Sequence, residues 1–445
     1  MVFFCYLRYN MNMSMSIYSI VMCKYIPSLC VNIYHRQREK EGYMDFSWKR
    51  LIYLMCAIQI GAGITIIGVL SFIPLYLVEL GLTDQGEAAM WAGLVSGVTP
   101  CMVALSAPFW SRKANELGPR KVMMFIFMTL MLAVGACSFA QTPTQLLVLR
   151  TLQGLVGGFV PIGLGIIVLV TPEDKVPWAM GLYQASMVMG LVFGPLMGGI
   201  TADLLGYRAP FLLFSALSGL CLLGVYKCMP NLQHTHKVDA SESQWSLIKS
   251  FMSIPTVRLL VFILFLCNFG ITGIGPILPL YIKHYMSVND DFVATIVGII
   301  IFGAGVFSAL ASISIGKLSR FMPMPRILCV STCGVGGFFI LQYLMPDVWG
   351  LGVSRALAGF FMGFITPIAN TLISKAVPIE RRSIVFGAVS SVVMMGNVLG
   401  PVISGMIARA ISYGAVFWST AAIFFIAALG VYWYLIYKPV LKYNR

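Results

Sequence analysis

The sequence predicts an all-α, polytopic membrane protein with twelve transmembrane helices in two pseudo-symmetric six-helix bundles. Three observations support this fold class. Of the 445 residues, 59% are hydrophobic and 10% are charged, and the mean hydropathy is +0.87, which excludes an ordinary soluble protein. Apolar segments long enough to cross a membrane recur at regular intervals. Several short motifs occur once in each half of the chain.

Residues 1–43 stand outside the predicted fold. Their best apolar run, Tyr9–Cys23, is interrupted by two Asn residues, so it is too short and too polar to span a membrane. It also lacks the small-residue cleavage site of a signal peptide. We interpret Met44 as the natural start of translation, because Lys40-Glu41-Gly42 can be encoded by a purine-rich ribosome-binding sequence. A disordered N-terminal tail is the alternative.

From Met44 onward the apolar segments predict the helices in order, each long enough to cross a hydrocarbon core of roughly 30 Å. The expected helices cover residues 51–80, 88–110, 122–140, 144–171, 177–203, 209–229, 258–284, 291–315, 326–345, 349–377, 383–408 and 414–437. The longest polar interval, residues 230–257, is a predicted linker between an N-terminal half, 44–229, and a C-terminal half, 258–445. Its two His residues have no further ligands nearby, so we expect no metal site.

Basic residues predict the orientation of the helices. Alternate loops and both tails carry twenty Lys and Arg residues from Met44 onward, whereas the opposite loops carry three. This asymmetry places both termini and the linker in the cytoplasm. Because the positive charges are spread over many loops, the net charge of +14 indicates topology control and not nucleic-acid binding.

Two basic residues, Arg150 and Arg355, lie inside predicted helices. A charge at membrane depth costs roughly 3 kcal/mol on insertion scales, so each is a candidate functional residue. Both begin the pattern Arg-x-Leu-x-Gly-x-x-x-Gly, at an offset of 205 residues. Glycines four apart lie on one helix face and allow another helix to approach closely.

Two further motifs repeat at the same spacing. Pro74-Leu75-Tyr76 recurs as Pro279-Leu280-Tyr281, 205 residues later, and the glycine pattern of 190–199 recurs in 396–405 at an offset of 206. The two halves are therefore predicted to be parallel repeats, related by an axis along the membrane normal. In the fifth helix, Gly194-Pro195 removes a backbone donor and predicts a bend that can serve as a hinge or a seal.

These motifs resemble those of the major facilitator superfamily, and in particular its twelve-helix drug/proton antiporter group. The segment Arg150–Gly154 is similar to the group's fourth-helix motif, and Gly190–Gly199 is similar to its antiporter motif. The resemblance covers nearly all of Met44–Lys438 and extends to bacterial multidrug-resistance exporters. It implies a location in the bacterial inner membrane and alternating access about a site at the membrane midplane.

The resemblance and the residues together suggest four sets of functional positions. Proton coupling and the cavity are expected to involve Arg150, Gln153 and Arg355. The antiporter hinge comprises Gly190, Gly194, Pro195, Gly198, Gly199, Gly400 and Pro401. A cytoplasmic gate loop contains Asn115, Glu116, Gly118, Arg120 and Lys121. Polar residues on apolar helices, which either bind substrate or join helices, are Gln59, Gln184, Asn268, Asn370 and Asn397.

The chain departs from the family pattern in its acidic residues. Asn115 stands where the gate loop usually has Asp, and Glu116 is a candidate substitute. No Asp or Glu lies in the middle of a predicted helix, and the nearest candidates are Glu79 and Asp203. Proton coupling is therefore implied by the resemblance alone. Gln153, backbone carbonyls and cavity water can compensate Arg150, or the cavity is electropositive and favours anionic or neutral amphiphiles over dications.

The expected function is multidrug efflux by proton antiport, without a cofactor and with the proton gradient as energy source. Importing or facilitating the passage of a small metabolite is the alternative within transporters. A membrane enzyme or receptor is disfavoured, because the helices carry no catalytic His/Ser/Asp set and no soluble domain is attached. The absence of a GxxxxGK[ST] run argues against ATP hydrolysis. We expect small-molecule substrates, a lipid environment, no nucleic-acid partner and a monomer.

Overall fold

A computed structural model of the chain describes residues 48–172, 175–231, 254–286, 288, 292–377 and 382–437. The chain divides into two units after Tyr53. The first unit contributes only the opening turns of α4 to the described residues, and the second contains all the other described helices. The predicted tail, residues 1–43, and most of the predicted linker, residues 230–257, lie outside the described part.

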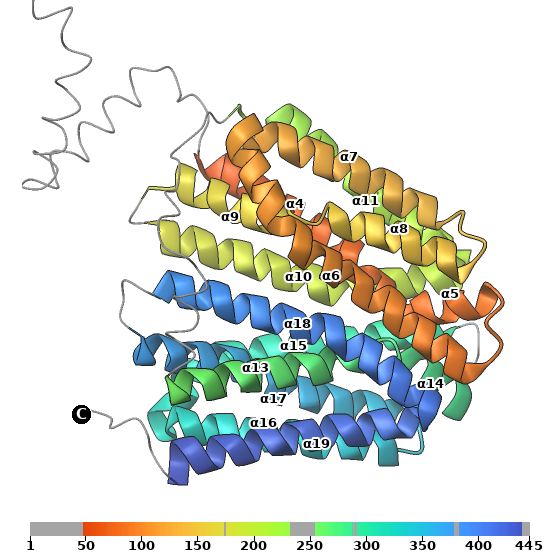
Figure 1. Ribbon diagram of the computed structural model, residues 1–445, viewed down its shortest axis with the longest axis vertical. Coiled ribbons are helices and arrows are strands. Elements are labelled where there is room, and N and C mark those ends of the chain that lie inside the picture. Colours follow the sequence, from red (N-terminus) through yellow and green to blue (C-terminus); the bar gives the residue numbers. More distant parts are fainter. Residues whose placement is uncertain are drawn as a thin grey trace, which may run out of the picture. The chain divides into compact units, whose positions relative to one another are not determined.

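The described elements are all helical (Figure 1). In chain order they are α4 (Trp48–Ile67), η1 (Gly68–Ser71), α5 (Ile73–Glu79), α6 (Gln85–Leu117), α7 (Pro119–Cys137), α8 (Pro143–Leu155), α9 (Phe159–Val170), α10 (Val176–Leu205), α11 (Ala209–Cys228), α13 (Pro255–Gly273), α14 (Leu278–Tyr285), α15 (Val293–Phe321), α16 (Met324–Leu344), α17 (Val348–Ala376), α18 (Arg382–Ala410), α19 (Tyr413–Val431) and the π-helical η5 (Tyr432–Tyr437). Within the described residues, twelve helical spans are long and apolar enough to cross a membrane, which confirms the predicted fold class.

The first and seventh predicted helices are interrupted at equivalent places. A 3-10 turn separates α4 from α5, and a turn separates α13 from α14, so the expectation of continuous helices over 51–80 and 258–284 is wrong. Pro74 and Pro279 occupy the first turns of α5 and α14, where a missing N–H does no harm but the preceding helix cannot continue. The hydroxyl of Tyr76 donates to the Ala140 carbonyl at 3.1 Å, which ties α5 to the end of α7.

The fourth predicted helix, expected as one piece over 144–171, is also divided, into α8 and α9. Gly157 and Gly158 are adjacent at the break, and Pro161 has no N–H to donate to the carbonyl of Gly157. The indole of Trp110 on α6 donates to the Leu155 carbonyl at 2.6 Å and so satisfies one acceptor at the end of α8. The equivalent α17 has Met362 in place of Gly157 and continues unbroken.

Glycines determine how closely the long helices pack within each half. A Cβ atom at Gly190 of α10 would lie 2.9 Å from the Gly63 Cα, and one at Gly194 would lie 3.0 Å from the Gly68 N. The repeat is visible in the second half, where Gly396 meets the backbone of α13 at the Phe265 carbonyl in the same way. Small residues therefore join α10 to α4 and η1, and α18 to α13.

The two halves meet through the pairs α6 with α18 and α10 with α15 (Figure 1). The close contacts occupy the first part of α6 and α15 and the last part of α10 and α18. Their glycine contacts pair Gly199 with Ala294, Gly298 with Pro195, Gly305 with Val192, Gly93 with Pro401, Gly97 with Val398 and Gly405 with Ala89. Smaller contacts between α5 and α14 lie at the same end of the helices, which we call the α5–α14 end.

Replacing Gly190 by Ala should lower the melting temperature of the purified protein in detergent. The added methyl group overpacks the contact with α4, which typically costs about 1–3 kcal/mol and exceeds the gain of roughly 0.5–1 kcal/mol from replacing a helical Gly by Ala. Gly181→Ala in the same helix is the matched control, because a Cβ there meets nothing within 4 Å. Equal melting temperatures for the two variants would contradict this account of the packing.

Candidate functional site

Arg150 is enclosed by its own half of the molecule. It lies in the second turn of α8 with only 2% of its surface exposed, and its Nη1 donates to Gln153 Oε1 at 2.6 Å. The hydroxyl of Thr99 on α6 donates to the Arg150 carbonyl at 3.2 Å, which fixes the two helices together at this level. Gly154, one helical turn after Arg150, packs against the backbone of Thr99. Gln153 is thus the principal partner of the guanidinium, as one of the sequence-based alternatives expected.

Arg355 occupies the equivalent position in α17 and is compensated differently. It is 7% exposed, and its guanidinium lies over the ring of Phe339 on α16, 5.2 Å from the centroid. Its Nη1 makes no hydrogen bond, and neither Arg355 nor Arg150 forms an ion pair within the described residues. A cation over an aromatic face is stabilised by the ring quadrupole. Both arginines, which the sequence predicts to contribute to the cavity, are thus buried with their described partners in their own halves.

Two of the predicted polar residues join helices. Gln59 Oε1 accepts a hydrogen bond of 2.6 Å from the hydroxyl of Tyr183, which links α4 to α10. Asn268 donates to the Leu264 carbonyl of its own helix at 2.8 Å, and the Cβ of Asn268 lies against Gly396 of α18. Tyr183 was not singled out from the sequence, because a Tyr in an apolar helix has no distinguishing local pattern.

The other three predicted polar residues have fewer partners. Asn370 is half-buried, and Asn397 has a buried Oδ1 without a hydrogen-bond partner. Gln184 is exposed on α10. A buried amide oxygen that lacks a partner is a position at which a ligand or water can bind.

The faces that join the halves continue beyond the contact region as exposed faces. On α10, the positions that follow Val192 on the same side toward the helix start are Val188, Ala185 and Gly181, and all are exposed. On α6, Ala104 and Pro108 continue the face of Gly93 and Gly97 and are exposed as well. Among the described residues, the close contacts between these helices therefore lie at the α5–α14 end, whereas the same faces of α6 and α10 are exposed toward the other end, where α10 also carries Gln184.

Comparison with known proteins decides the family. A sequence model described as the Major Facilitator Superfamily matches residues 54–341 and 260–445. The chain belongs to the Major Facilitator Superfamily. The family match confirms the expected family and the class of transporters, and with the twelve spans it makes the chain a multi-pass membrane protein.

Similar proteins of this superfamily extend over nearly the whole transporter. The chain is 30% identical to the multidrug resistance protein MdtG of Proteus mirabilis over 85% of its length and 94% of that protein. It is 28% identical to a multi-drug resistance efflux pump PmrA homolog of Lactococcus lactis, over 83% of its own length and 91% of that protein. A solved bacterial homolog of the human lysosomal transporter Spinster, in an inward-facing and occupied conformation, has a TM-score of 0.73 at 16% identity, covering 86% and 96% of the two chains. These relatives are bacterial, in agreement with a bacterial membrane protein.

The predicted gate loop of this transporter is a single residue between two helices. Gly118, with φ of +89°, connects α6 directly to α7, and this conformation favours glycine. Arg120 donates to the Tyr226 carbonyl at 2.5 Å and to Asn231 at 3.3 Å, so it anchors α7 to the end of α11. Glu116 pairs with Lys113 of its own helix at 2.7 Å. The described contacts of the loop thus lie within the first half.

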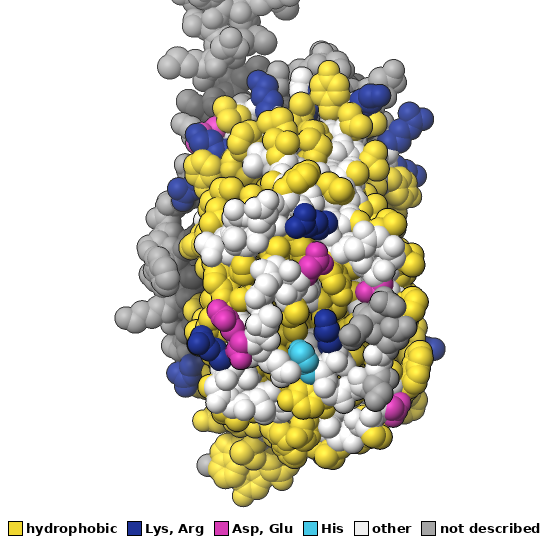
Figure 2. All heavy atoms as spheres, turned by 90° about the vertical axis from the view of Figure 1, so that its right-hand side faces the viewer, with side chains coloured by type: hydrophobic (Ala, Val, Ile, Leu, Met, Phe, Trp, Pro, Cys, Tyr) yellow, Lys and Arg dark blue, Asp and Glu magenta, His cyan; other side chains and the backbone are white. Residues whose placement is uncertain are grey.

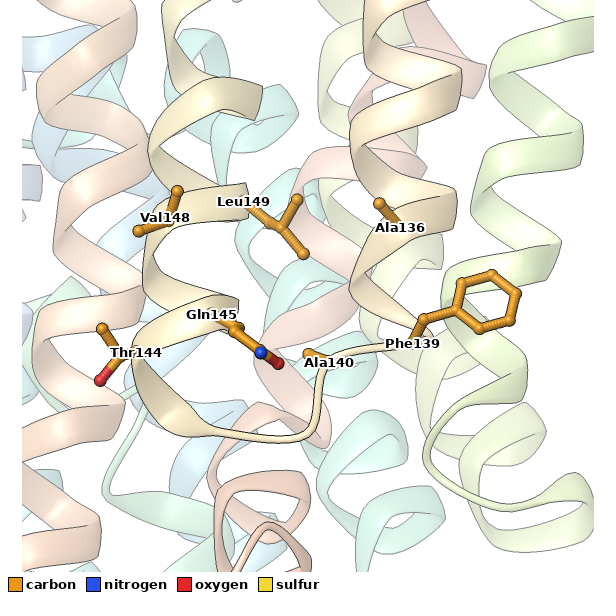
Figure 3. A pocket seen from close by; sticks show the side chains of 7 residues that line it. All are labelled: Ala136, Phe139, Ala140, Thr144, Gln145, Val148 and Leu149. Carbon is orange, nitrogen blue, oxygen red and sulfur yellow. The ribbon is translucent and has the colours of Figure 1, made fainter.

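Two surface pockets have no predicted cavity residue among their lining residues. Figure 3 shows one of about 440 Å³ at the turn between α7 and α8, lined by Ala136, Gln145 and Leu149 among others. A second, of about 510 Å³, lies between α13 and α18 and includes Arg258 and Tyr434. Figure 2 shows the face at the α5–α14 end, where basic and acidic side chains are dispersed among apolar ones.

Replacing Gln153 by Ala should destabilise the transporter more than replacing Gln184 by Ala. The first change leaves the buried Arg150 guanidinium without its side-chain acceptor, and an unsatisfied buried donor costs about 1–3 kcal/mol. The second removes an exposed side chain without described partners and should change the free energy of unfolding by less than about 0.5 kcal/mol. Chemical unfolding in detergent measures both. A Gln153→Ala protein as stable as the control would show that Arg150 does not depend on this bond.

Proposed function

We propose that this transporter exports structurally diverse drugs in exchange for protons by alternating access. The observation that supports the mechanism most directly is the distribution of contacts between the halves. They meet backbone to backbone at the α5–α14 end and present exposed faces at the other. Such an arrangement is one end state of a transporter whose halves rock about a central site. The names of the bacterial relatives, MdtG and PmrA homolog, support drugs as the cargo.

The orientation follows from the distribution of basic residues. With the termini in the cytoplasm of a bacterial inner membrane, the α5–α14 end faces the periplasm, and the exposed faces of α6 and α10 face the cytoplasm. The contacts then describe an inward-open state that is closed to the outside. This state can accept amphiphilic drugs from the cytoplasm or from the inner leaflet.

The two buried arginines support a preference for anionic or neutral amphiphiles. Arg150 and Arg355 both place a guanidinium in a low-dielectric interior without an ion pair within the described residues. Their field disfavours a dication that approaches the midplane, whereas an anionic group would be attracted. Gln184 on the exposed face of α10 and Asn397 with its unpartnered oxygen are the polar groups that we assign to orienting the drug.

Energy is proposed to come from the proton gradient, with no cofactor, no enzymatic reaction, no nucleic-acid partner and a monomeric protein. Gly194 and Pro195 in α10, where the antiporter motif lies, favour export. Facilitated import of a small metabolite is the competing function, and the direction of transport separates the two.

A dye-efflux assay in a host deleted for its own pumps tests the function. Expression of the chain should lower cell-associated dye, and an uncoupler should restore it, because the proton gradient drives export. Arg150→Ala should reduce the efflux rate at least tenfold, which corresponds to about 1.4 kcal/mol. Arg320→Ala, which removes an arginine from the last turn of α15, is the control and should leave efflux unchanged. Dye uptake that falls when the uncoupler is added would identify an importer.

Matched drugs test the charge preference. For pairs of similar size and hydrophobicity, the anionic member should be exported several times faster than the dicationic member in inverted membrane vesicles. Replacing Arg355 by Met keeps an apolar contact with Phe339 and removes the charge, so it should reduce the difference between the two drugs. A consistent preference for dications in the unmodified protein would overturn this part of the proposal.

A further inference from the structure

The N-terminus of α15 is capped by a carboxylate from the other half of the molecule. Asp203, in the last turn of α10, accepts hydrogen bonds from the backbone N–H of Ala294 at 3.3 Å and of Thr295 at 2.5 Å. These two amides belong to the first turn of α15, where N–H groups have no partner within the helix. The residue that precedes α15, Phe292, provides no side-chain cap, and the first turn contains no acidic residue.

The cap depends on the halves being together. Beside it, Gly199 of α10 lies against the Ala294 backbone, and Pro195 lies against Gly298. A helix N-terminus carries partial positive charge, so a carboxylate placed there makes stronger hydrogen bonds than a neutral group. If α10 and α15 separate at this end, Asp203 and the first turn of α15 lose these bonds together.

The repeated interface lacks this arrangement, which shows that the cap is not a general requirement of the fold. At the offset of 206 that relates α10 to α18, Asp203 corresponds to Arg409. There α6 is capped by its own preceding residue, since Asp84 accepts from the Glu87 N–H at 2.7 Å. Arg409 lies against Gly86 and contacts the Met90 sulfur. The cap of α6 therefore survives separation of the halves, but the cap of α15 does not.

We propose that Asp203 is a positioning residue that holds the α5–α14 end closed, by a charged cap that exists only while α10 and α15 are in contact. The carboxylate selects the state observed here over the state open at this end. The inference rests on the proposed alternating-access function, because it assigns the residue to one of the two end states. It needs no contact between Asp203 and the transported drug.

Removing the charge should shift the conformational equilibrium. Asp203→Asn keeps the shape and one acceptor oxygen but removes the charge, so the closed state loses stabilisation that the open state never had. We expect the population open at the α5–α14 end to rise about tenfold, equivalent to about 1.4 kcal/mol. Asp347→Asn is the control, because Asp347 accepts from the Trp349 and Gly350 N–H groups of its own helix α17 and this cap lies within one half, so the population should not change.

A cysteine reporter distant from Asp203 measures this population. Val402 on α18 packs against Gly97 of α6 in the other interface, so a thiol there becomes more accessible when this end opens. Val402→Cys would be introduced into a full-length chain without its native cysteines, and the rate of maleimide modification would be measured in detergent, where both ends are accessible. Gel filtration and thermal unfolding of each sample verify that the variants are folded.

The proposal expects modification of Val402→Cys to be about tenfold faster with Asp203→Asn than with Asp203. The rate should return toward the original value with Asp203→Glu and should stay unchanged with Asp347→Asn. Equal rates for folded Asp203 and Asp203→Asn would overturn it, as would equal acceleration by Asp347→Asn. If Asp203→Asn does not fold, Asp203→Glu and Asp203→Gln provide the same comparison between a charged and a neutral side chain of equal length. Drug efflux is not part of this readout, so a failure of the proposed function is recognised separately by the dye assay.

Discussion

The structure depends on helix α10 and its repeat α18 approaching two neighbours at backbone distance. One neighbour belongs to the same half and the other to the opposite half. Gly190 and Gly194 face α4 and η1, whereas Gly199 faces α15. The glycines of the antiporter motif therefore serve two surfaces, of which, in the proposed alternating-access mechanism, one stays together and the other separates. An added Cβ atom on the surface that packs against the same half destabilises that half. An added Cβ atom on the surface that packs against the opposite half obstructs closure of the α5–α14 end.

Each buried arginine of this transporter is stabilised by residues of its own half. The Arg150 guanidinium donates to the Gln153 amide of its own helix, and the Arg355 guanidinium lies over the Phe339 ring of the neighbouring helix. Neither of these interactions involves a carboxylate of the other half. Buried charge can then stay in place while the halves move, because its partners move with it. The Asp203 carboxylate accepts hydrogen bonds from the other half, and it lies at the end of its helix, where the two halves meet.

The pseudo-symmetry of the halves separates what the fold requires from what is particular to one interface. Breaks before Pro74 and Pro279 and the glycine contacts of α10 and α18 occur in both halves. The break between α8 and α9 and the exchange of Asp203 for Arg409 occur in one. Of these two differences, the exchange of Asp203 for Arg409 lies where the halves meet and can give the two interfaces different strengths.

The sequence alone determined the twelve spans and the repeated motifs of the two halves, and it offered Gln153 as one of several possible partners of Arg150. Each of these depends on apolar length or on residues within one or two helical turns, which are local properties. The tertiary structure decided that the Tyr183 hydroxyl donates to Gln59, that the Trp110 indole donates to a carbonyl at the end of α8, and that Asp203 caps α15. The partners in these contacts are 45 to 124 residues apart. No local pattern encodes which distant backbone group a side chain meets, because that depends on how the helices pack.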